Sequence, residues 1–144
     1  MKVSDILRQK GDAVMTVRPD DTMENLCHRL RIERVGALIV SADGEAIDGI
    51  ISERDVAHGL AEHGADLPAT KVSSLMTKSV VTCSPEDTIA DIARIMTNRR
   101  VRHLPVKSGG KLAGIVSVGD VVKHRIDEIE MEANVLRDYA VARL

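Results

Sequence analysis

The stretch that decides the fold is Gly49-Ile50-Ile51-Ser52-Glu53-Arg54-Asp55, because its pattern returns later as Gly114-Ile115-Val116-Ser117-Val118-Gly119-Asp120. Each copy is a short apolar, β-branched run that ends at a serine, with an aspartate three residues later and helix-like sequence beyond. The run predicts a buried strand, and the serine predicts the N-cap of a following helix. A hydroxyl, a carboxylate and unpaired backbone N–H groups would then meet at each helix start. Such a place suits a sugar that lies beside a phosphate.

Two interpretations of the Ser-x-x-Asp pattern remain open. The first is a capping box, in which the serine and the acid satisfy donors at the helix start. Aspartate is shorter than the preferred glutamate, so its recurrence favours a second role. In that role Asp55 and Asp120 accept hydrogen bonds from both ribose hydroxyls, Ser52 and Ser117 seat the sugar, and phosphates lie in the positive field of the helix ends. Capping and ligand binding can also coexist.

The repetition extends well beyond this motif. A shift of 66 residues, which brings Val14 onto Val80, superimposes identical residues at Val14, Thr16, Pro19, Asp21, Thr22, Arg34, Val35, Leu38 and Val40. A one-residue deletion in a hairpin loop keeps the two Ser-x-x-Asp motifs in register. We therefore predict two copies of one unit, repeat 1 at residues 1–66 and repeat 2 at 67–124, with pseudo-twofold packing and two related clefts between them.

The predicted elements follow the same order in each repeat. The first repeat is expected to contain a short helix at 3–8 capped by Ser4, strands at 14–17, 37–40 and 47–51, and helices that start at Thr22 and Ser52. The second is expected to contain a short helix at 72–76, a strand at 80–82, a helix that starts at Thr88, and a hairpin of 103–107 with 112–116.

The last helix is predicted over 118–139. Its part beyond repeat 2 belongs to a separate C-terminal extension at 125–144. The apolar residues of the helix alternate in steps of four and three, at Val122, Ile126, Ile129, Ala133, Leu136 and Ala140. This spacing is a heptad seam. The seam could pack on its own domain, but an intermolecular contact is favoured, since two small repeats already have enough helices to cover their sheets.

Composition excludes several classes of function. The chain has 144 residues and is 44% hydrophobic, but its one aromatic residue is Tyr139, so the core must be aliphatic and bases cannot stack on it. The formal net charge is −2 and acidic and basic residues are interspersed along the chain, which argues against a nucleic-acid partner. No run approaches membrane length and no signal segment is apparent, so we expect no membrane association and a cytoplasmic location.

Other reactive side chains show no constellation of their own. Cys27 and Cys83 are expected to be core thiols, although a disulfide or redox pair is the alternative. The histidines that lie outside the two motifs are expected at the surface, without metal-ligand spacing: His28, His58, His63 and His124. No nucleophile–base pair or phosphate-binding loop is present, which makes a hydrolase or transferase improbable and implies no metal requirement.

The two repeats differ where the second enters its hairpin. Repeat 2 carries Arg102 and His103 where repeat 1 has Gly36 and Ala37. Charged residues that lead into a buried strand need a partner. A phosphate would serve, because arginine binds it in a bidentate way. The alternative is that Arg102 pairs with a local acid and His103 is a surface or core imidazole. The asymmetry predicts that the two clefts are not equivalent.

With these motifs in place, the chain resembles a tandem pair of cystathionine β-synthase (CBS) domains, a Bateman module. The resemblance rests on both Gly-Ile-Ile/Val-Ser-x-x-Asp motifs, the run Arg102-His103-Leu104-Pro105-Val106, and the pairs Met15-Thr16 and Met76-Thr77. It covers nearly the whole chain apart from the terminal helix. It implies an α/β (α+β) fold of two β-α-β-β-α units about a pseudo-twofold axis, often assembled as a disc-like homodimer.

The resemblance also implies ligands and site residues. The ligands are adenosine compounds, with AMP first and ATP, ADP, NAD(H) and S-adenosylmethionine as alternatives. Ribose would bind Ser117 and Asp120 in one cleft, and Ser52 and Asp55 in the other. Arg102 and His103 match positions that face phosphates. Adenine would be lined by Lys10, Asp12, Val14 and Met15 in the Ser117 cleft, and by Thr77, Val80 and Val81 in the Ser52 cleft. Repeat 1 lacks the basic pair and the proline at 36–39, which makes occupation of the Ser52 cleft less expected.

The function implied is a non-enzymatic sensor of adenine nucleotides, whose ligand alters a dimer or a contact with an unidentified protein target. The alternative is a structural homodimerisation module in which both Ser-x-x-Asp motifs are only helix caps and the terminal seam makes the contact.

Overall fold

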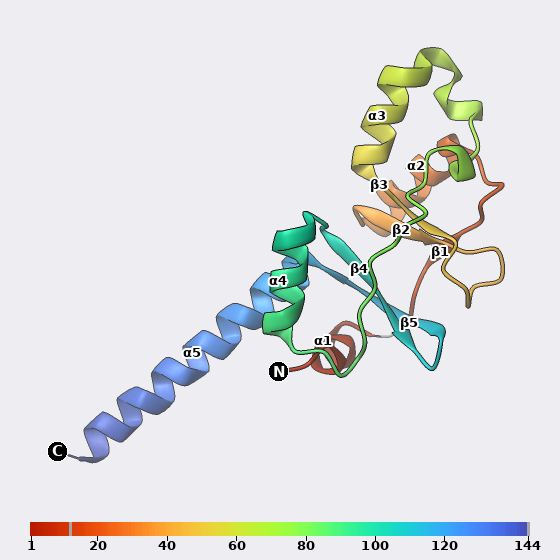
Figure 1. Ribbon diagram of the computed structural model, residues 1–144. Coiled ribbons are helices and arrows are strands. Elements are labelled where there is room, and N and C mark those ends of the chain that lie inside the picture. The colour runs from red at the N-terminus through yellow and green to blue at the C-terminus, as the bar shows by residue number, and fades with distance from the viewer. Residues whose placement is uncertain (12, 144) are drawn as a thin grey trace.

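The two repeats fold into two lobes of similar construction, seen in a computed structural model that describes residues 1–11 and 13–143 (Figure 1). Lobe 1 consists of β1 (Thr16–Val17), α2 (Met23–Glu33), β2 (Ala37–Val40), β3 (Gly49–Ser52), α3 (Glu53–His63) and the 3-10 helix η1 (Gly64–Ala69). Lobe 2 contains α4 (Ile89–Arg99), β4 (His103–Ser108), β5 (Lys111–Ser117) and the start of α5 (Val118–Ala142). The predicted α/β class with a long C-terminal helix is confirmed.

Each lobe has a small sheet that leads directly into a helix. In lobe 1 the strand order is β1-β2-β3, with β1 parallel and β3 antiparallel to β2. In lobe 2, β4 and β5 form an antiparallel pair. Ala37 lies opposite Ser52 in the first sheet, and His103 lies opposite Ser117 in the second. The sheet register therefore fixes what stands beside each helix-starting serine.

The first segment of each repeat packs in the other lobe. The N-terminal helix α1 (Val3–Lys10) places Val3 and Ile6 in the core of lobe 2, and the backbone N–H of Val3 donates to Asp87 at 2.9 Å. The 3-10 helix η2 (Val72–Ser74) places Val72 in the core of lobe 1, where its N–H donates to Asp21 at 2.9 Å. The packing units thus cross the division of the sequence at residue 66.

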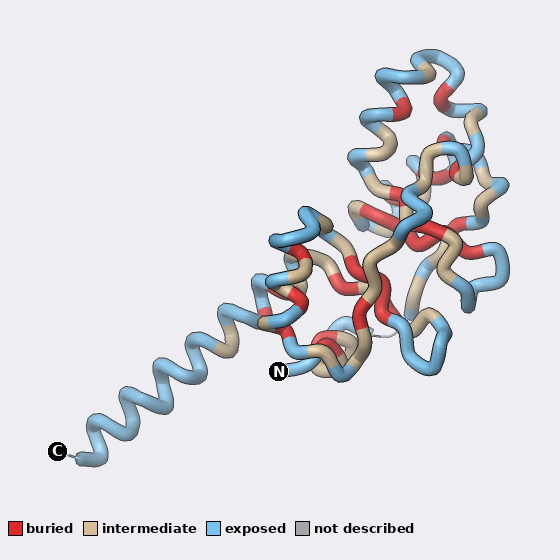
Figure 2. The backbone as a smooth tube through the Cα atoms, viewed as in Figure 1, coloured by how far each residue is buried: buried red, intermediate tan, exposed pale blue. Residues whose placement is uncertain are grey.

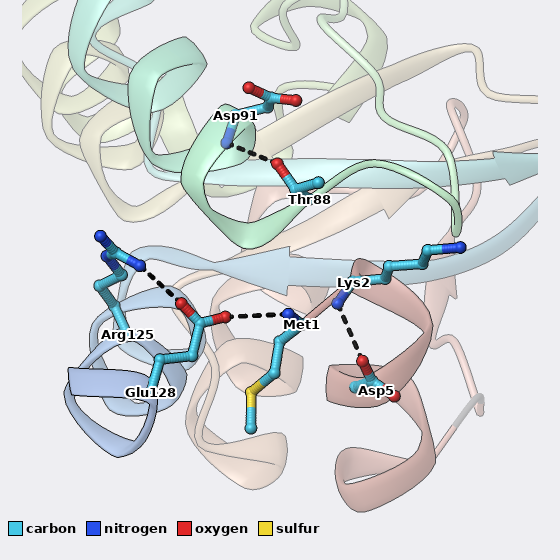
Figure 3. Close-up of polar contacts among 7 residues, drawn as sticks. All are labelled: Met1, Lys2, Asp5, Thr88, Asp91, Arg125 and Glu128. Carbon is cyan, nitrogen blue, oxygen red and sulfur yellow. Dashed lines mark hydrogen bonds and ion pairs between the residues drawn. The ribbon is translucent and has the colours of Figure 1, made fainter. Parts of the chain in front are cut away.

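Polar contacts hold α1 against lobe 2 (Figure 3). The amino group of Met1 pairs with Glu128 of α5 at 3.2 Å, and Arg125 contacts the same carboxylate at 2.6 Å. The helix begins at Val3 as predicted and runs to Lys10, two residues beyond the predicted end. Its N-cap is Lys2 rather than Ser4, and the Lys2 N–H donates to Asp5 at 2.8 Å. The predicted cap at Thr88 is confirmed by the hydrogen bond that its hydroxyl accepts from the Asp91 N–H.

Two other elements differ from their predictions. The strand predicted at 80–82 is reduced to one bridge, Cys83 with Val106, because Thr77 still pairs with lobe 1 and the chain must cross between the lobes before it reaches β4. The helix predicted at 72–76 is a single 3-10 turn at 72–74. Both deviations occur where the second repeat's first segment changes lobes.

Two aliphatic clusters form the core, as the composition predicts (Figure 2). Cys83 is buried in the lobe 2 cluster, but Cys27 is exposed, so the prediction of two core thiols is wrong for Cys27. On α2 it is Leu26 and Leu30 that turn inward, which leaves Cys27 outside. His124 was expected at the surface and is instead buried, because it shares the inner face of α5 with Val121.

The glycine that opens each motif has no room for a side chain. A Cβ at Gly49 would lie 2.8 Å from the backbone oxygen of Thr77, and one at Gly114 would lie 2.6 Å from Cδ2 of Leu7. Thr77 and Leu7 belong to the segments that are exchanged between the lobes. The two glycines therefore permit the close crossing that joins the lobes.

We predict that Gly49→Ala destabilises the protein by about 1–3 kcal/mol, because a backbone atom cannot move aside without disturbing the crossing. Gly114→Ala should cost less, since its obstacle is the end of a flexible side chain. Urea denaturation of both variants measures the difference. Equal losses, or a larger loss for Gly114→Ala, would contradict this account of the crossing.

Candidate functional site

Both Ser-x-x-Asp motifs form capping boxes. At α3 the N–H of Ser52 donates to Asp55 Oδ2 at 2.8 Å, and at α5 the N–H of Ser117 donates to Asp120 Oδ2 at 2.9 Å. The first helical N–H of α3 is bound by the carbonyl of Gly36 at 3.0 Å. Within the described residues, hydrogen bonds to Asp55 involve Oδ2 only. The capping interpretation is confirmed, and Oδ1 of Asp55 remains available to a ligand.

A cavity of about 260 Å³ opens beside the Asp55 motif, between the lobes. Its lining combines Gly36, Ile50, Ser52 and Asp55 of lobe 1, Thr77 of the connecting segment, and Arg100, Arg102 and His103 of lobe 2. Thr77 is fixed there by two backbone hydrogen bonds with Ile50, of 3.0 and 2.9 Å. We call this cavity the Ser52 cleft.

Two of the three arginines of the Ser52 cleft, and its histidine, come from repeat 2, whereas Arg54 comes from repeat 1. Arg102 and His103 lie at the start of β4, on the side of lobe 2 that faces lobe 1, and Arg54 and Arg100 join them in the lining. Among the residues that the structure describes, none of these three guanidinium groups forms an ion pair. The basic pair that repeat 1 lacks is thus supplied to this cleft by repeat 2, so its absence from repeat 1 is no argument against occupation of the Ser52 cleft.

At the start of α5, where the Ser117 cleft is predicted, a lysine of the same chain contacts Asp120. Nζ of Lys10 lies 2.8 Å from Asp120 Oδ2 and 3.1 Å from the carbonyl oxygen of Ile115. Burial alone would raise the pKa of Asp120, but hydrogen bonds from Lys10 and Ser117 outweigh it and hold the pKa below its ordinary value. Lys10, expected to line adenine here, binds the acid that would hold the ribose.

His103 lies between the two motifs. A Cβ built on Gly36 would be 3.5 Å from its Cε1, so the imidazole rests on the backbone of repeat 1. Burial, together with the positive charges of Lys10 and Arg102, holds the pKa of His103 below its ordinary value, while Glu53 and Asp120 act in the opposite direction. The half-buried side chain is therefore neutral at pH 7.

The remaining predicted residues lie apart from the Ser52 cleft. Val81 packs against the lobe 2 core and Val80 is half-buried, and neither lines the cavity. Val14 and Met15 were predicted for the Ser117 cleft, and they are half-buried and exposed, respectively. Asp12 lies outside the described residues.

Sequence reasoning missed Arg100, Arg54 and Gly36 as lining residues. Arg100 caps α4 with a left-handed backbone (φ 53°), and Arg34, its counterpart in repeat 1, caps α2 in the same way (φ 55°). The presence of arginine at this position in both repeats was a signal that sequence reasoning could have used. Non-glycine residues seldom adopt this conformation, so an arginine that occurs here twice points to a role of its own.

The described residues contain no cluster of three metal-ligating side chains. None of the described helices is long and apolar enough to cross a membrane.

Comparison with known proteins identifies the family. The CBS domain family model matches residues 3–62 and 72–127. This chain belongs to the CBS domain family. It is 33% identical, over 95% of its length and 70% of the relative's, to the mitochondrial CBS domain-containing protein CBSX3 of Arabidopsis thaliana. A CBS-domain containing protein of Agrobacterium tumefaciens shares the fold with a TM-score of 0.83 and 43% identity, over 87% of this chain and 99% of that one.

Another CBS pair of known structure is CBSX2 in complex with AMP, which has a TM-score of 0.71 and 26% identity over 88% of this chain and 96% of that chain. The predicted resemblance to a CBS pair is thus confirmed.

We predict that His103 makes this CBS pair less stable in mild acid. The unfolded chain takes up a proton at the ordinary histidine pKa near 6.5, whereas the folded chain resists it, so the free energy of unfolding falls as the pH drops below about 6.5. Urea denaturation at about pH 7.5 and 5.5 measures this fall, and His103→Gln should reduce it. An unchanged pH dependence in that variant would show that His103 titrates normally.

Proposed function

We propose that the chain is a regulatory CBS pair that binds an adenosine phosphate in the Ser52 cleft and performs no chemistry on it. One observation carries the proposal: the cavity joins the Ser-x-x-Asp motif of repeat 1 to free guanidinium groups of repeat 2. The site thus combines an acceptor for a sugar with cations for a phosphate, and no nucleophile–base pair was recognised in the sequence.

The available oxygen of Asp55 would accept hydrogen bonds from the ribose hydroxyls, with Ser52 beside it. Adenine would lie against Ile50 and Thr77, where backbone atoms are fixed by their mutual hydrogen bonds. Arg102 would bind the phosphate, and His103 would donate a hydrogen bond to it. The AMP complex of CBSX2 supports a ligand of this class.

The charge of the cleft orders the candidate ligands. Arg54, Arg100 and Arg102 outnumber the two acids of the lining, Glu53 and Asp55, and favour anions. AMP, ADP, ATP and NAD(H) therefore fit better than S-adenosylmethionine, whose sulfonium group is positive. In the Ser117 cleft a ribose would have to displace Lys10 from Asp120. We propose that the Ser52 cleft fills first, and that ligand binding there alters a homodimer or a contact with a protein target.

A structural homodimerisation module without a physiological nucleotide is the second candidate. The apolar seam of α5 favours it, because that surface is exposed and none of its residues lines the Ser52 cleft. The candidates differ in thermal unfolding: a ligand at a hundred times its Kd adds about 2.7 kcal/mol to stability. No shift with AMP, ADP, ATP or NAD(H) would leave only the structural role.

We predict that Asp55→Ala weakens AMP binding by about 1–3 kcal/mol, because the ribose loses its acceptor. Asp120→Ala is a matched control, since it removes an equivalent helix cap and should leave the first binding event nearly unchanged. Isothermal titration calorimetry measures both affinities, after circular dichroism has shown that both variants fold. Wild-type affinity in Asp55→Ala, or a loss confined to Asp120→Ala, would refute the assignment to the Ser52 cleft.

A further inference from the structure

The distal part of α5 carries an apolar seam that no other described residue covers. Figure 2 shows that α5 is exposed along most of its length beyond lobe 2. Its heptad seam has large exposed fractions: 50% at Val122 and Ile126, 52% at Ile129 and 68% at Leu136. At 100° per residue, the seam lies about 130° round the helix from Val121 and His124, which face the body. The alternative that the seam packs on its own domain is therefore wrong.

The family fold does not account for this surface. The CBS match ends at residue 127, and the structure from Agrobacterium tumefaciens covers 87% of this chain although 99% of that protein is aligned. Residues 128–142 thus extend α5 beyond the family match by about four turns. A free helix of this length that exposes Ile129 and Leu136 gains no burial to stabilise it.

A groove of about 580 Å³ meets the seam at its other end. It runs between α4 and α5 and is lined by Met96, Val118, Val121 and Val122, together with Arg100 and Arg102. Val122 belongs to both groove and seam. One continuous apolar strip therefore extends from the groove to Leu136.

We propose that this strip binds α5 of a second copy of the chain in antiparallel orientation, so that each extension reaches the α4–α5 groove of the other copy. The antiparallel register that centres on Ile126 and Ile129 pairs large residues with small ones. Ile126 meets Ile129 of the partner subunit, Val122 meets Ala133 of the partner subunit, and Gly119 meets Leu136 of the partner subunit. Such alternation fills an interface without voids.

Charges on both flanks of the seam suit the same register. Lys123 and Arg125 flank the proximal half, and Glu130 and Glu132 flank the distal half. Antiparallel packing brings Lys123 beside Glu130 of the partner subunit, and Arg125 beside Glu132 of the partner subunit. Within residues 1–11 and 13–143, Lys123, Glu130 and Glu132 have no ion-pair partner in their own chain.

A parallel pair fits less well. In register it would oppose Gly119 to Gly119, Ala133 to Ala133 and Ala140 to Ala140, which leaves gaps in three layers. It would also direct both extensions away from the grooves. Steric fill therefore selects the antiparallel arrangement, although a parallel pair would satisfy charges too.

The inference rests on the homodimer of the proposed function and specifies its interface. Arg100 and Arg102 line both the groove and the Ser52 cleft, so the extension of one copy would end next to the ligand site of the other. Nucleotide binding and dimer formation nevertheless use different side chains, and they can be tested separately.

Disulfide trapping tests the orientation. In a Cys27→Ser background, we expect a mixture of Val122→Cys and Ala133→Cys chains to form the mixed disulfide, while neither chain alone crosslinks to itself. Cys83 is buried and stays reduced in all samples. Self-crosslinking of Val122→Cys alone would show parallel packing and overturn the proposal, and so would the absence of any crosslink in a dimeric sample.

Sedimentation equilibrium tests the surface. Ile129→Glu places a charge at the central layer of each helix and should raise the Kd of the dimer about a hundredfold or more. Met131→Glu is the matched control, because Met131 is 60% exposed on the opposite side of α5 and should not change the Kd. AMP titration of both variants separates the proposals: unchanged affinity in a monomeric Ile129→Glu leaves the nucleotide site intact. A dimer that survives Ile129→Glu would refute the α5 interface, and a monomeric wild type would refute the homodimer as well.

Discussion

The reciprocal exchange of the first segments is the constraint on which the rest of the structure depends. α1 completes the core of lobe 2 and η2 completes the core of lobe 1, so neither lobe has its full core without the other repeat. Because of this exchange, the segment with Thr77 passes close to Gly49 and the segment with Leu7 passes close to Gly114, and the two glycines leave space for them. The inter-lobe surface, and with it the Ser52 cleft, is thus a by-product of burying Val3, Ile6 and Val72.

The same backbone plan carries different electrostatics on its two sides. Ile50 and Ile115 occupy equivalent places, but the carbonyl of Ile50 accepts the backbone N–H of Thr77, whereas that of Ile115 accepts the ammonium of Lys10. One motif therefore faces a cavity with free cations, and the other has its acid already neutralised. His103 lies between them and is influenced by charges from both, since Glu53 belongs to one helix start and Asp120 to the other. Pseudo-symmetry of the fold thus coexists with a difference in the charges that surround the two motifs.

Sequence reasoning succeeded where the signal was local or repeated. Thr22, Ser52, Thr88 and Ser117 cap their helices as predicted, because a cap depends on residues within one turn. The partition of residues between clefts could not be derived in this way, since repeat alignment compares Arg102 with Gly36 and does not reveal that both line one cavity. Cys27 and His124 were misplaced for a similar reason: helical spacing identifies a face, but only tertiary packing decides which face turns inward.

The long helix shows how one element can serve two kinds of contact. Its first turn presents Ser117 and Asp120 to the inter-lobe surface, and its next turns bury Val121 and His124 against α4 and α1. Beyond residue 128 the body ends, yet apolar residues continue on the side that lobe 2 never touches. Because the seam is displaced round the helix from the buried face, a partner can bind along it without disturbing the packing that places Asp120. The face of α5 that packs on lobe 2 and the face that would bind a partner thus lie on different sides of one helix. This helix physically connects the Asp120 motif at its N-terminus with the proposed interface at its distal end.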